Sequence, residues 1–411
     1  MSVLRYWLWL SALRGVGVRT AARLLEEAGS PEEIYFTRST DLDRFPWLTA
    51  GEKAALSDKE LDTAARIADS CAETGTQVIT LNDAAYPERL RNIPDPPVLL
   101  YASGSLPPVD DLPAVAIVGT RSCTPYGIKT AERIAYEYTL AGGLVVTGLA
   151  RGVDTAAARG ALRAGGRVVC VLGNGTNVIY PRENAALYQD VQTVGALISE
   201  YPPDTQPTRS AFPARNRVMS GISAGVLVIE APEHSGALIT ASRALDQGRD
   251  LFAVPGNVDA EACAGSNRLL KEGAGLVTSG WDLADEYRAL YPDKLKERGQ
   301  RPEVPLDEKQ ARKLVAGEAS GPVHWEKAEK ESIDKQKNAD YIDQVRPAAE
   351  LDGDERIVAG AISRPDMPVD DIIADSGLPA SKVLTALTLL EIKGYASQRS
   401  GKRFTLNVTV K

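Results

Sequence analysis

The sequence predicts an α/β protein whose main domain is an extended, Rossmann-like, doubly wound parallel sheet. Short apolar runs rich in β-branched residues recur along the middle of the chain, and a turn rich in glycine or proline follows most of them. A helical window of about ten to fifteen residues follows most of these turns, which is the pattern of βαβ units. Unbroken apolar runs are typical of strands that are buried on both faces. The 411 residues are enough for about two or three domains.

The first 82 residues are expected to form a separate helical domain. The run LRGVGVRTAARLLEEAG (13–29) indicates a helix end, a Gly-x-Gly turn and a second helix. This pattern resembles a helix-hairpin-helix element, whose turn amides contact the DNA backbone. A SAM-like (sterile-α-motif-like) packing module with an ordinary glycine turn fits equally well, so both interpretations stay open.

Residues 83–290 are expected to hold the parallel sheet. Six strands are predicted, at 114–118, 143–147, 167–172, 196–199, 225–229 and 250–254, and a helix is predicted at 266–272. In such a sheet, ligands bind beyond the carboxyl ends of the strands.

The turn Gly119-Thr120-Arg121, directly after the first of these strands, is a candidate anion site. Glycine lets a phosphate approach the backbone, threonine offers a hydroxyl, and the guanidinium fork matches phosphate geometry. A tight turn with a solvated arginine explains the same three residues when they are taken alone.

Further basic residues follow the other strands on the same edge of the sheet. With Arg121 they form a set of six arginines: Arg121, Arg151, Arg182, Arg209, Arg215 and Arg217. The segment 205–217 holds three of them and no acid, with Phe212 in between. Arginines that follow phosphates and an aromatic face that stacks on an unpaired base are typical of single-strand binders. The alternative is that Phe212 is a core residue.

Seven runs between residues 86 and 274 resemble the DNA-processing protein A family (DprA, also called Smf). They are YPERLRNIPDPPVLLYASG (86–104), VAIVGTRSCTPYG (115–127), VVTGLARGVDTAAARGAL (145–162), VLGNGTNVIYPREN (171–184), ISEYPPDTQPTRSAFPARNRVMSG (198–221), VLVIEAPEHSGALITASRAL (226–245) and LFAVPGNVDAEACAGSNRLLKEGA (251–274). One departure is Ala158, where the family usually has a histidine. No role is assigned to that position.

The resemblance implies a protein that protects incoming single-stranded DNA in natural transformation and loads the RecA recombinase onto it. It places Arg121, Arg209 and Phe212 in the DNA pocket, with Arg182, Asn216 and Arg217 as further contacts. It also implies a homodimer through the Rossmann-like domain, with the contact near Leu269 and Leu270, which are expected to lie side by side on a helix surface.

The net charge of −8 argues against a protein covered in basic patches. Basic residues must then be concentrated in a local pocket, and binding should depend strongly on salt.

Residues 291–350 read as a charged linker, with a transient helix expected at 309–314. His324 lies in it, and His234 is the chain's other histidine, which leaves little room for histidine-based catalysis or a metal site. Residues 351–411 are expected to form a winged helix. Lys382 is the single base in its presumptive recognition helix, so a protein-interaction module is favoured, with weak duplex contact through Arg399, Lys402 and Arg403.

Two other classes of function were weighed. The Rossmann-like domain resembles nucleotide-processing enzymes of the lysine-decarboxylase-like group, but Arg243 stands where their catalytic glutamate falls. A guanidinium cannot replace a carboxylate in acid–base chemistry. A winged-helix transcription factor with a sensor domain is the second alternative. The chain is therefore expected to be no enzyme and to need no cofactor.

The four cysteines lie far apart, so neither a disulfide nor a zinc site is expected. The apolar run at the N-terminus is short and interrupted by Arg5, so neither a signal peptide nor a membrane span is expected. The cytoplasm is the expected location.

Overall fold

A computed structural model describes residues 3–297, 345–346, 351, 353–362, 367–392, 395–399, 403–406 and 409–410. The chain divides into two compact units, Met1–Ala311 and Arg312–Lys411. Each unit is considered by itself. The transient helix expected at 309–314 and His324 lie outside the described residues.

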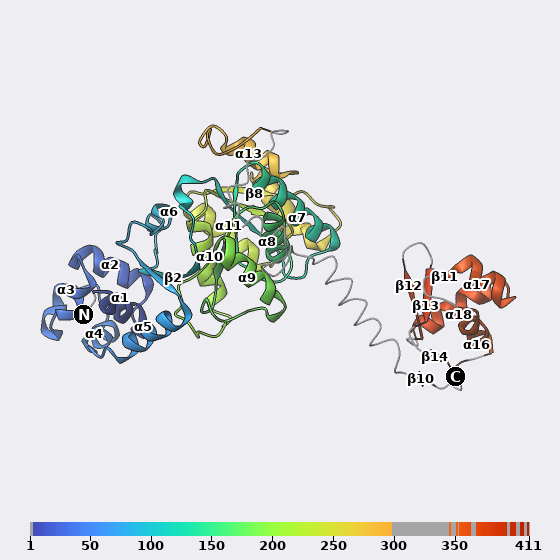
Figure 1. The fold of residues 1–411 in the computed structure, drawn as a ribbon, viewed down its shortest axis with the longest axis horizontal. Helices are drawn as coiled ribbons and strands as arrows, with labels where there is room; N and C mark the ends of the chain where they lie inside the picture. The colour runs from blue at the N-terminus through green and yellow to red at the C-terminus, as the bar shows by residue number, and fades with distance from the viewer. Residues whose placement is uncertain are drawn as a thin grey trace. The chain divides into compact units, whose positions relative to one another are not determined.

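The first unit begins with a group of helices, which are α1 (Leu4–Ala12), α2 (Val18–Ala28), α3 (Pro31–Phe36), the 3₁₀ helix η1 (Ser39–Arg44), α4 (Ala50–Ser57) and α5 (Asp62–Thr74). Gly15, in the turn between α1 and α2, has a φ of +96°, a conformation that favours glycine. Buried Trp7, Leu10 and Leu24 belong to a core that also includes Leu99 of the sheet. The helices therefore pack on one edge of the sheet (Figure 1).

The sheet has nine strands in the order β1-β2-β6-β5-β4-β3-β7-β8-β9. Their bounds are β1 (Gln77–Thr80), β2 (Leu99–Gly104), β3 (Ala114–Val118), β4 (Leu144–Thr147), β5 (Val168–Leu172), β6 (Ala196–Ser199), β7 (Gly225–Val228), β8 (Asp250–Ala253) and β9 (Gly275–Leu276). Strands β3 to β8 confirm the six predicted strands to within a residue or so. The sheet is not wholly parallel, because β2 runs antiparallel to both β1 and β6.

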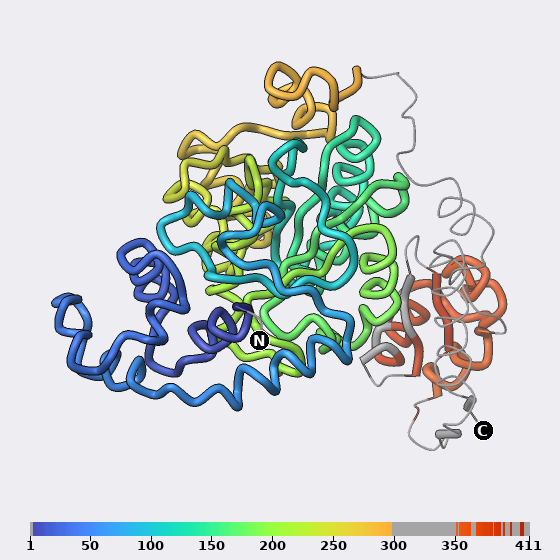
Figure 2. Tube along the Cα trace, turned by 60° about the vertical axis from the view of Figure 1, so that its left-hand side comes forward, coloured from blue at the N-terminus to red at the C-terminus, as the bar shows by residue number. Residues whose placement is uncertain are grey.

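Helices cover both faces of the sheet (Figure 2). They are α6 (Glu88–Arg91), α7 (Pro125–Leu140), α8 (Val153–Arg163), α9 (Ala185–Val194), α10 (Ala211–Gly221), α11 (Gly236–Asp246), α12 (Ala264–Lys271) and α13 (Gly280–Tyr287), with short 3₁₀ helices η2 (Val109–Asp111), η3 (Arg182–Asn184) and η4 (Glu261–Cys263). One core lies between the sheet and α7, α8, α9 and α13. A second core lies on the opposite face, under α6, α10, α11 and α12. Ala158 is fully buried in the first core.

The second unit is built of α16 (Gly353–Ala361), α17 (Val369–Ser376), α18 (Ala380–Ile392) and a small sheet of β11 (Met367–Pro368), β12 (Ala396–Arg399) and β13 (Arg403–Leu406). The short strands β10 (Val345–Arg346) and β14 (Thr409–Val410) pair with each other. The three helices and the hairpin give the predicted winged helix. Lys382 on α18 forms an ion pair of 3.0 Å with Asp354. The tip of the wing, with Lys402, lies outside the described residues, as does the side chain of Arg399.

In the described part of the chain, no helix is long and apolar enough to cross a bilayer.

Candidate nucleic-acid interface

A cavity of about 840 Å³ lies where the winding of the sheet reverses. Strands β4, β5 and β6 extend the sheet on one side of β3, and β7 and β8 extend it on the other. The cavity is lined by the loop after β3, the loop between β7 and α11, and residues of α8 and α10. Such a crevice at the carboxyl ends of parallel strands is the usual ligand site of a doubly wound sheet.

The loop after β3 is held tightly against the protein. A Cβ atom on Gly119 would lie 2.5 Å from Val153 Cγ2 and 2.9 Å from the Glu230 carbonyl oxygen, so only glycine fits there. The Thr120 amide donates to that same carbonyl over 2.8 Å. The Ser122 amide donates to Thr120 Oγ1 over 3.3 Å. The loop is therefore fixed, and it carries Arg121 to the exposed mouth of the crevice.

Arg121, Phe212 and Tyr180 form a stack beside the crevice. The Arg121 guanidinium carbon lies 4.5 Å from the centre of the Phe212 ring, a cation–π contact. The Tyr180 ring lies 5.6 Å from the Phe212 ring at an interplanar angle of 33°. In the described part of the chain, Arg121 forms neither an ion pair nor a hydrogen bond through its side chain. The sequence did not single out Tyr180, because the stack joins two loops and the start of α10, which are far apart in the chain.

Arg215 lies below this stack, in the floor of the cavity, and is almost completely buried. Its Nη1 donates to the carbonyl oxygen of Gly148 over 2.8 Å and also to that of Val171. Its Nε donates to Asn216 Oδ1 over 3.1 Å. Burial lowers the pKa of Arg215, and the nearby Asp154 carboxylate opposes that shift. These bonds fix the guanidinium in the floor.

Asp154, in the first turn of α8, also lines the cavity. Burial raises the pKa of Asp154 from 3.8 to about 6, although the charges of Arg215 and Arg121 lower it. A carboxyl group with a pKa near neutrality in a cleft is typical of functional sites.

Arg217 does not line the cavity, although it is only two residues from Arg215. Its side chain is 6% exposed and forms an ion pair with Glu200. It also donates to the Asp95 carbonyl oxygen over 2.6 Å, and its Nε lies 3.8 Å from Asp95 Oδ2. Its hydrogen bonds are therefore made inside the protein.

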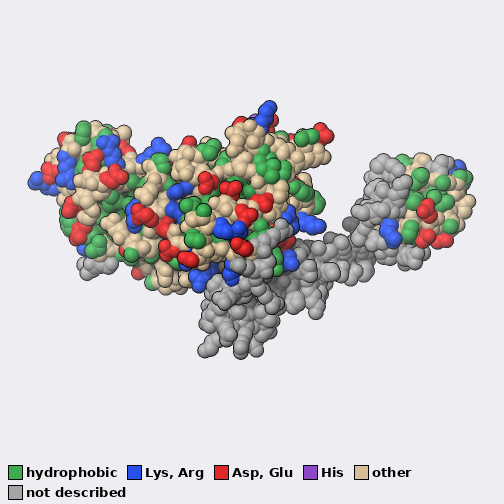
Figure 3. All heavy atoms as spheres, turned by 90° about the horizontal axis from the view of Figure 1, so that it is seen from above, with side chains coloured by type: hydrophobic (Ala, Val, Ile, Leu, Met, Phe, Trp, Pro, Cys, Tyr) green, Lys and Arg blue, Asp and Glu red, His purple; other side chains and the backbone are tan. Residues whose placement is uncertain are grey.

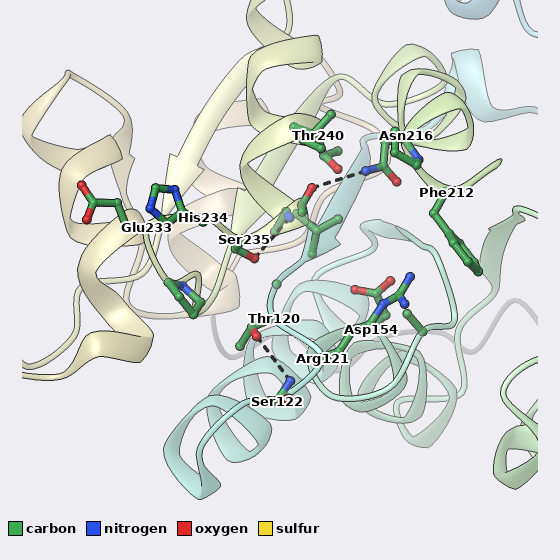
Figure 4. Close-up of a pocket in the computed structure, with 18 of the residues that line it drawn as sticks. Thr120, Arg121, Ser122, Asp154, Phe212, Asn216, Glu233, His234, Ser235 and Thr240 are labelled. Atoms are coloured by element: carbon green, nitrogen blue, oxygen red, sulfur yellow. Dashed lines mark hydrogen bonds between the residues drawn. The ribbon is translucent and has the colours of Figure 1, made fainter. Parts of the chain in front are cut away.

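The three remaining arginines of the predicted set lie on the surface outside the cavity lining. Arg151 forms a two-point ion pair with Glu183, with 3.2 Å between Nη2 and Oε2. Arg182 and Arg209 form no ion pair within the described residues. The structure thus brings Gly119, Thr120, Arg121, Phe212, Arg215 and Asn216 together around one cavity (Figure 4).

The predicted dimer residues are less exposed than expected. Leu269 is 7% exposed and belongs to the core under α12, and Leu270 is half-buried beside it. More exposed apolar side chains on neighbouring elements are those of Leu245, Leu276 and Leu290, at 61%, 60% and 71%. A helix in contact with the sheet buries one side of its surface, and Leu269 lies on that side.

Among the described residues, no three histidine, cysteine, aspartate or glutamate side chains are grouped so that they could hold a metal ion. All four cysteines are free.

Two family models match the chain. Residues 77–288 match the family described as DNA recombination-mediator protein A, and residues 343–402 match the DprA winged helix domain. The chain is 31% identical to Protein Smf of Synechocystis sp. over 97% of this chain and 98% of that relative. It is 43% identical to the DNA processing protein DprA of Streptococcus pneumoniae over 50% of this chain and 72% of that relative.

The fold is similar to that of a solved structure. The X-ray structure of DprA from Streptococcus pneumoniae superposes with a TM-score of 0.60 at 33% identity, covering 70% of this chain and 99% of that one.

Proposed function

Because this chain belongs to the DNA-processing protein A (DprA) family, we propose that it is a single-stranded DNA-binding protein that protects incoming DNA in natural transformation and loads the RecA recombinase onto it. In this proposal the strand binds at the crevice between β3 and β7. The protein acts as a binding protein rather than an enzyme, in the cytoplasm, where four free thiols stay reduced.

The observation that carries the proposal is the Arg121 guanidinium, which is stacked on Phe212 at the mouth of the crevice and forms no ion pair with any of the described residues. Arginine without an internal partner is available to a phosphate, and an aromatic face is available to a base. Tyr180 extends the aromatic surface. The bases of a duplex are already stacked on one another, so this arrangement favours a single strand.

The distribution of charge supports a local site. The net charge is −8, and the face in Figure 3 shows basic and acidic side chains interspersed rather than gathered in a large patch of one sign. Affinity must then come from a few well-placed contacts rather than from a broad basic surface.

We divide the predicted site residues into two roles. Gly119, Thr120, Arg121, Phe212, Arg182 and Arg209 are proposed to contact the strand, with Arg151 as an outer contact that must share its charge with Glu183. Arg215, Asn216 and Arg217 are proposed to position α10, because their polar atoms are bonded inside the protein.

We also propose a homodimer in which the region around α12 meets a second copy. Leu270 remains half-buried, and the exposed Leu276 lies on the edge strand β9. Leu270→Arg and Leu276→Arg should each shift the protein toward the monomer mass in light scattering at micromolar concentration. A monomeric wild type would contradict this part of the proposal.

The domain limits are proposals as well. Strand β1 belongs to the large sheet, so we place the end of the helical domain between α5 and Gln77 rather than at residue 82. The winged helix is proposed as an interaction module, because Lys382 is occupied by Asp354.

The test is a titration of labelled single-stranded and double-stranded oligonucleotides of equal length at two salt concentrations. The proposal expects clear preference for the single strand and weaker binding at the higher salt. Tighter binding of the duplex would overturn it and would favour the transcription-factor interpretation.

A further inference from the structure

The crevice has a second polar end, away from Arg121 and Phe212. Helix α11 begins there, and Ser235, Gly236 and Ala237 line the cavity. Ser235 Oγ accepts a hydrogen bond of 3.3 Å from the Ala237 amide and so caps the helix. The first turn of this eleven-residue helix places the positive end of its dipole at the cavity.

Thr240, one turn further along α11, lines the same cavity although it is only 1% exposed. In the described part of the chain its hydroxyl group has no hydrogen-bond partner. A threonine inside a helix usually donates to the carbonyl oxygen four residues earlier, which here belongs to Gly236. That oxygen instead accepts a bond of 3.4 Å from Asn216 Nδ2.

Figure 4 shows the consequence for Thr240. Its hydroxyl oxygen is turned toward the space between Asn216 and Ser235, while Phe212 lies at the other side of the cavity. The hydroxyl group is open to the cavity, where it can donate a hydrogen bond to a bound oxygen. The hydroxyl group of Thr240 and the N-terminus of α11 therefore lie at the same part of the cavity.

Two of the three carboxylates that line the cavity lie near arginines, which offset their negative charge. Of the carboxylates that line the cavity, Glu233 lies 3.7 Å from Arg268, and Asp154 faces Arg215 and Arg121. Glu261 is exposed to solvent, and His234 offers a further ring nitrogen beside Ser235.

We propose that the end of the crevice formed by Ser235, Gly236, Ala237 and Thr240 is a subsite for a phosphate monoester. A monoester has three free oxygens and a charge between −1 and about −2 at neutral pH, so it gains more from a helix N-terminus than an internal phosphodiester does. The group is either the terminal phosphate of the bound strand or the phosphate of a free mononucleotide. This inference rests on the proposed function, because the strand is the ligand that brings a phosphate to the crevice.

The test compares oligothymidylates that carry a 5′-phosphate, a 3′-phosphate or only hydroxyl ends, with thymidine monophosphate and thymidine as competitors. A hydrogen bond to a charged group predicts about tenfold tighter binding of one phosphorylated strand, or about tenfold better competition by the nucleotide than by the nucleoside. The first result identifies a strand end as the source, and the second identifies a free nucleotide. Equal binding in all of these comparisons would overturn the subsite.

Three variants assign the effect to the hydroxyl group. Thr240→Val keeps the shape of the side chain and should abolish the phosphate preference, whereas Thr240→Ser should keep it. Thr193→Val is the matched control, because Thr193 is exposed on α9 and its hydroxyl bonds to the Gln189 carbonyl oxygen. A phosphate preference that survives Thr240→Val in a folded protein would also overturn the subsite.

The design separates this inference from the proposed function. Thr240→Val should bind strands with phosphate ends and strands with hydroxyl ends equally, whereas Arg121→Glu should bind neither. Loss of phosphate discrimination in the wild type, with normal strand binding, would therefore count against the subsite alone. Absence of strand binding in the wild type would count against the proposed function.

Discussion

Some arginines of the predicted site are exposed and others are buried side chains of α10, and the two groups form different contacts. Arg121, at the rim, rests on Phe212, and neither it nor the exposed Arg209 has an ion pair within the described residues. Inside α10, Arg215 donates to two backbone carbonyl oxygens and Arg217 pairs with Glu200. From this difference we infer different roles for the two groups, according to what each guanidinium already bonds to rather than its place in a motif.

The largest expected effect is on stability, at Arg217. Arg217→Ala leaves Glu200, whose side chain is 15% exposed, without its cation, and removing one partner of a buried ion pair costs up to about 3–5 kcal/mol in the free energy of unfolding. Arg209→Ala, at an exposed site, should change that free energy by less than about 0.5 kcal/mol. Chemical denaturation measures the free energy of unfolding of both variants. Equal values would contradict the assignment of a structural role to Arg217 but not to Arg209.

Asp154, which also lines the cavity, should make the free energy of unfolding depend on pH. Its pKa is raised by burial from 3.8 to about 6, so the folded chain holds this proton more tightly than the unfolded chain does. The contribution of Asp154 to the free energy of unfolding is therefore complete below about pH 4 and is lost as the pH rises to about 6, a change of about 3 kcal/mol.

Asp154→Asn removes this carboxyl group, so the free energy of unfolding should change less with pH between about pH 4 and 6. Protonation also removes a negative charge near Arg121, so single-strand affinity should rise as the pH falls through 6 in the wild type but less so in the variant. Other groups also line the cavity, so the variant is the comparison that isolates the contribution of Asp154. An unchanged pH profile in Asp154→Asn would show that Asp154 does not titrate there.

The aromatic part of the rim is expected to contribute less than the charges. Phe212→Ala should weaken single-strand binding by about 1–3 kcal/mol, the usual contribution of one stacked base, whereas Phe212→Tyr should retain most of the affinity. Fluorescence anisotropy with one labelled oligonucleotide compares the two. Equal loss in both variants would indicate that Phe212 supports the fold instead of stacking on a base.

Several features of this rim could be predicted from the sequence. The strands that lead to the crevice are continuous apolar runs, such as Ala114–Val118, and glycine marks the close approach at residue 119. Strands β1 and β2 were missed, because they join the sheet antiparallel at its edge and follow no βαβ pattern.

Other features depend on residues brought together by folding. The burial of Arg217 requires Glu200 and Asp95, and the sequence spacing gives no sign of that contact. The hydrogen bond from Asn216 to the Gly236 carbonyl oxygen joins two different helices. The prediction that Leu269 lies on the surface was wrong. Two adjacent leucines do not indicate which side of α12 faces the sheet, and Leu269 is the one in the core.

The smallest effect is expected when the winged helix is removed. A chain that ends after Glu297 keeps every residue that we assign to the strand, and it keeps Leu295, which is buried in the core of the first unit. Its single-strand affinity should stay close to that of the full chain, because every residue that we assign to the strand is retained. Loss of single-strand binding in a folded, shortened protein would move the DNA site to the winged helix.

Charge reversal at Arg121 tests the central claim most directly. Arg121→Glu replaces the guanidinium at the rim with a repelling carboxylate, and the control Arg163→Glu makes the same change at the opposite end of α8 from the crevice. We predict that Arg121→Glu abolishes single-strand binding with an unchanged melting temperature, while Arg163→Glu binds nearly as the wild type does. Near-normal affinity in a folded Arg121→Glu variant would contradict the account.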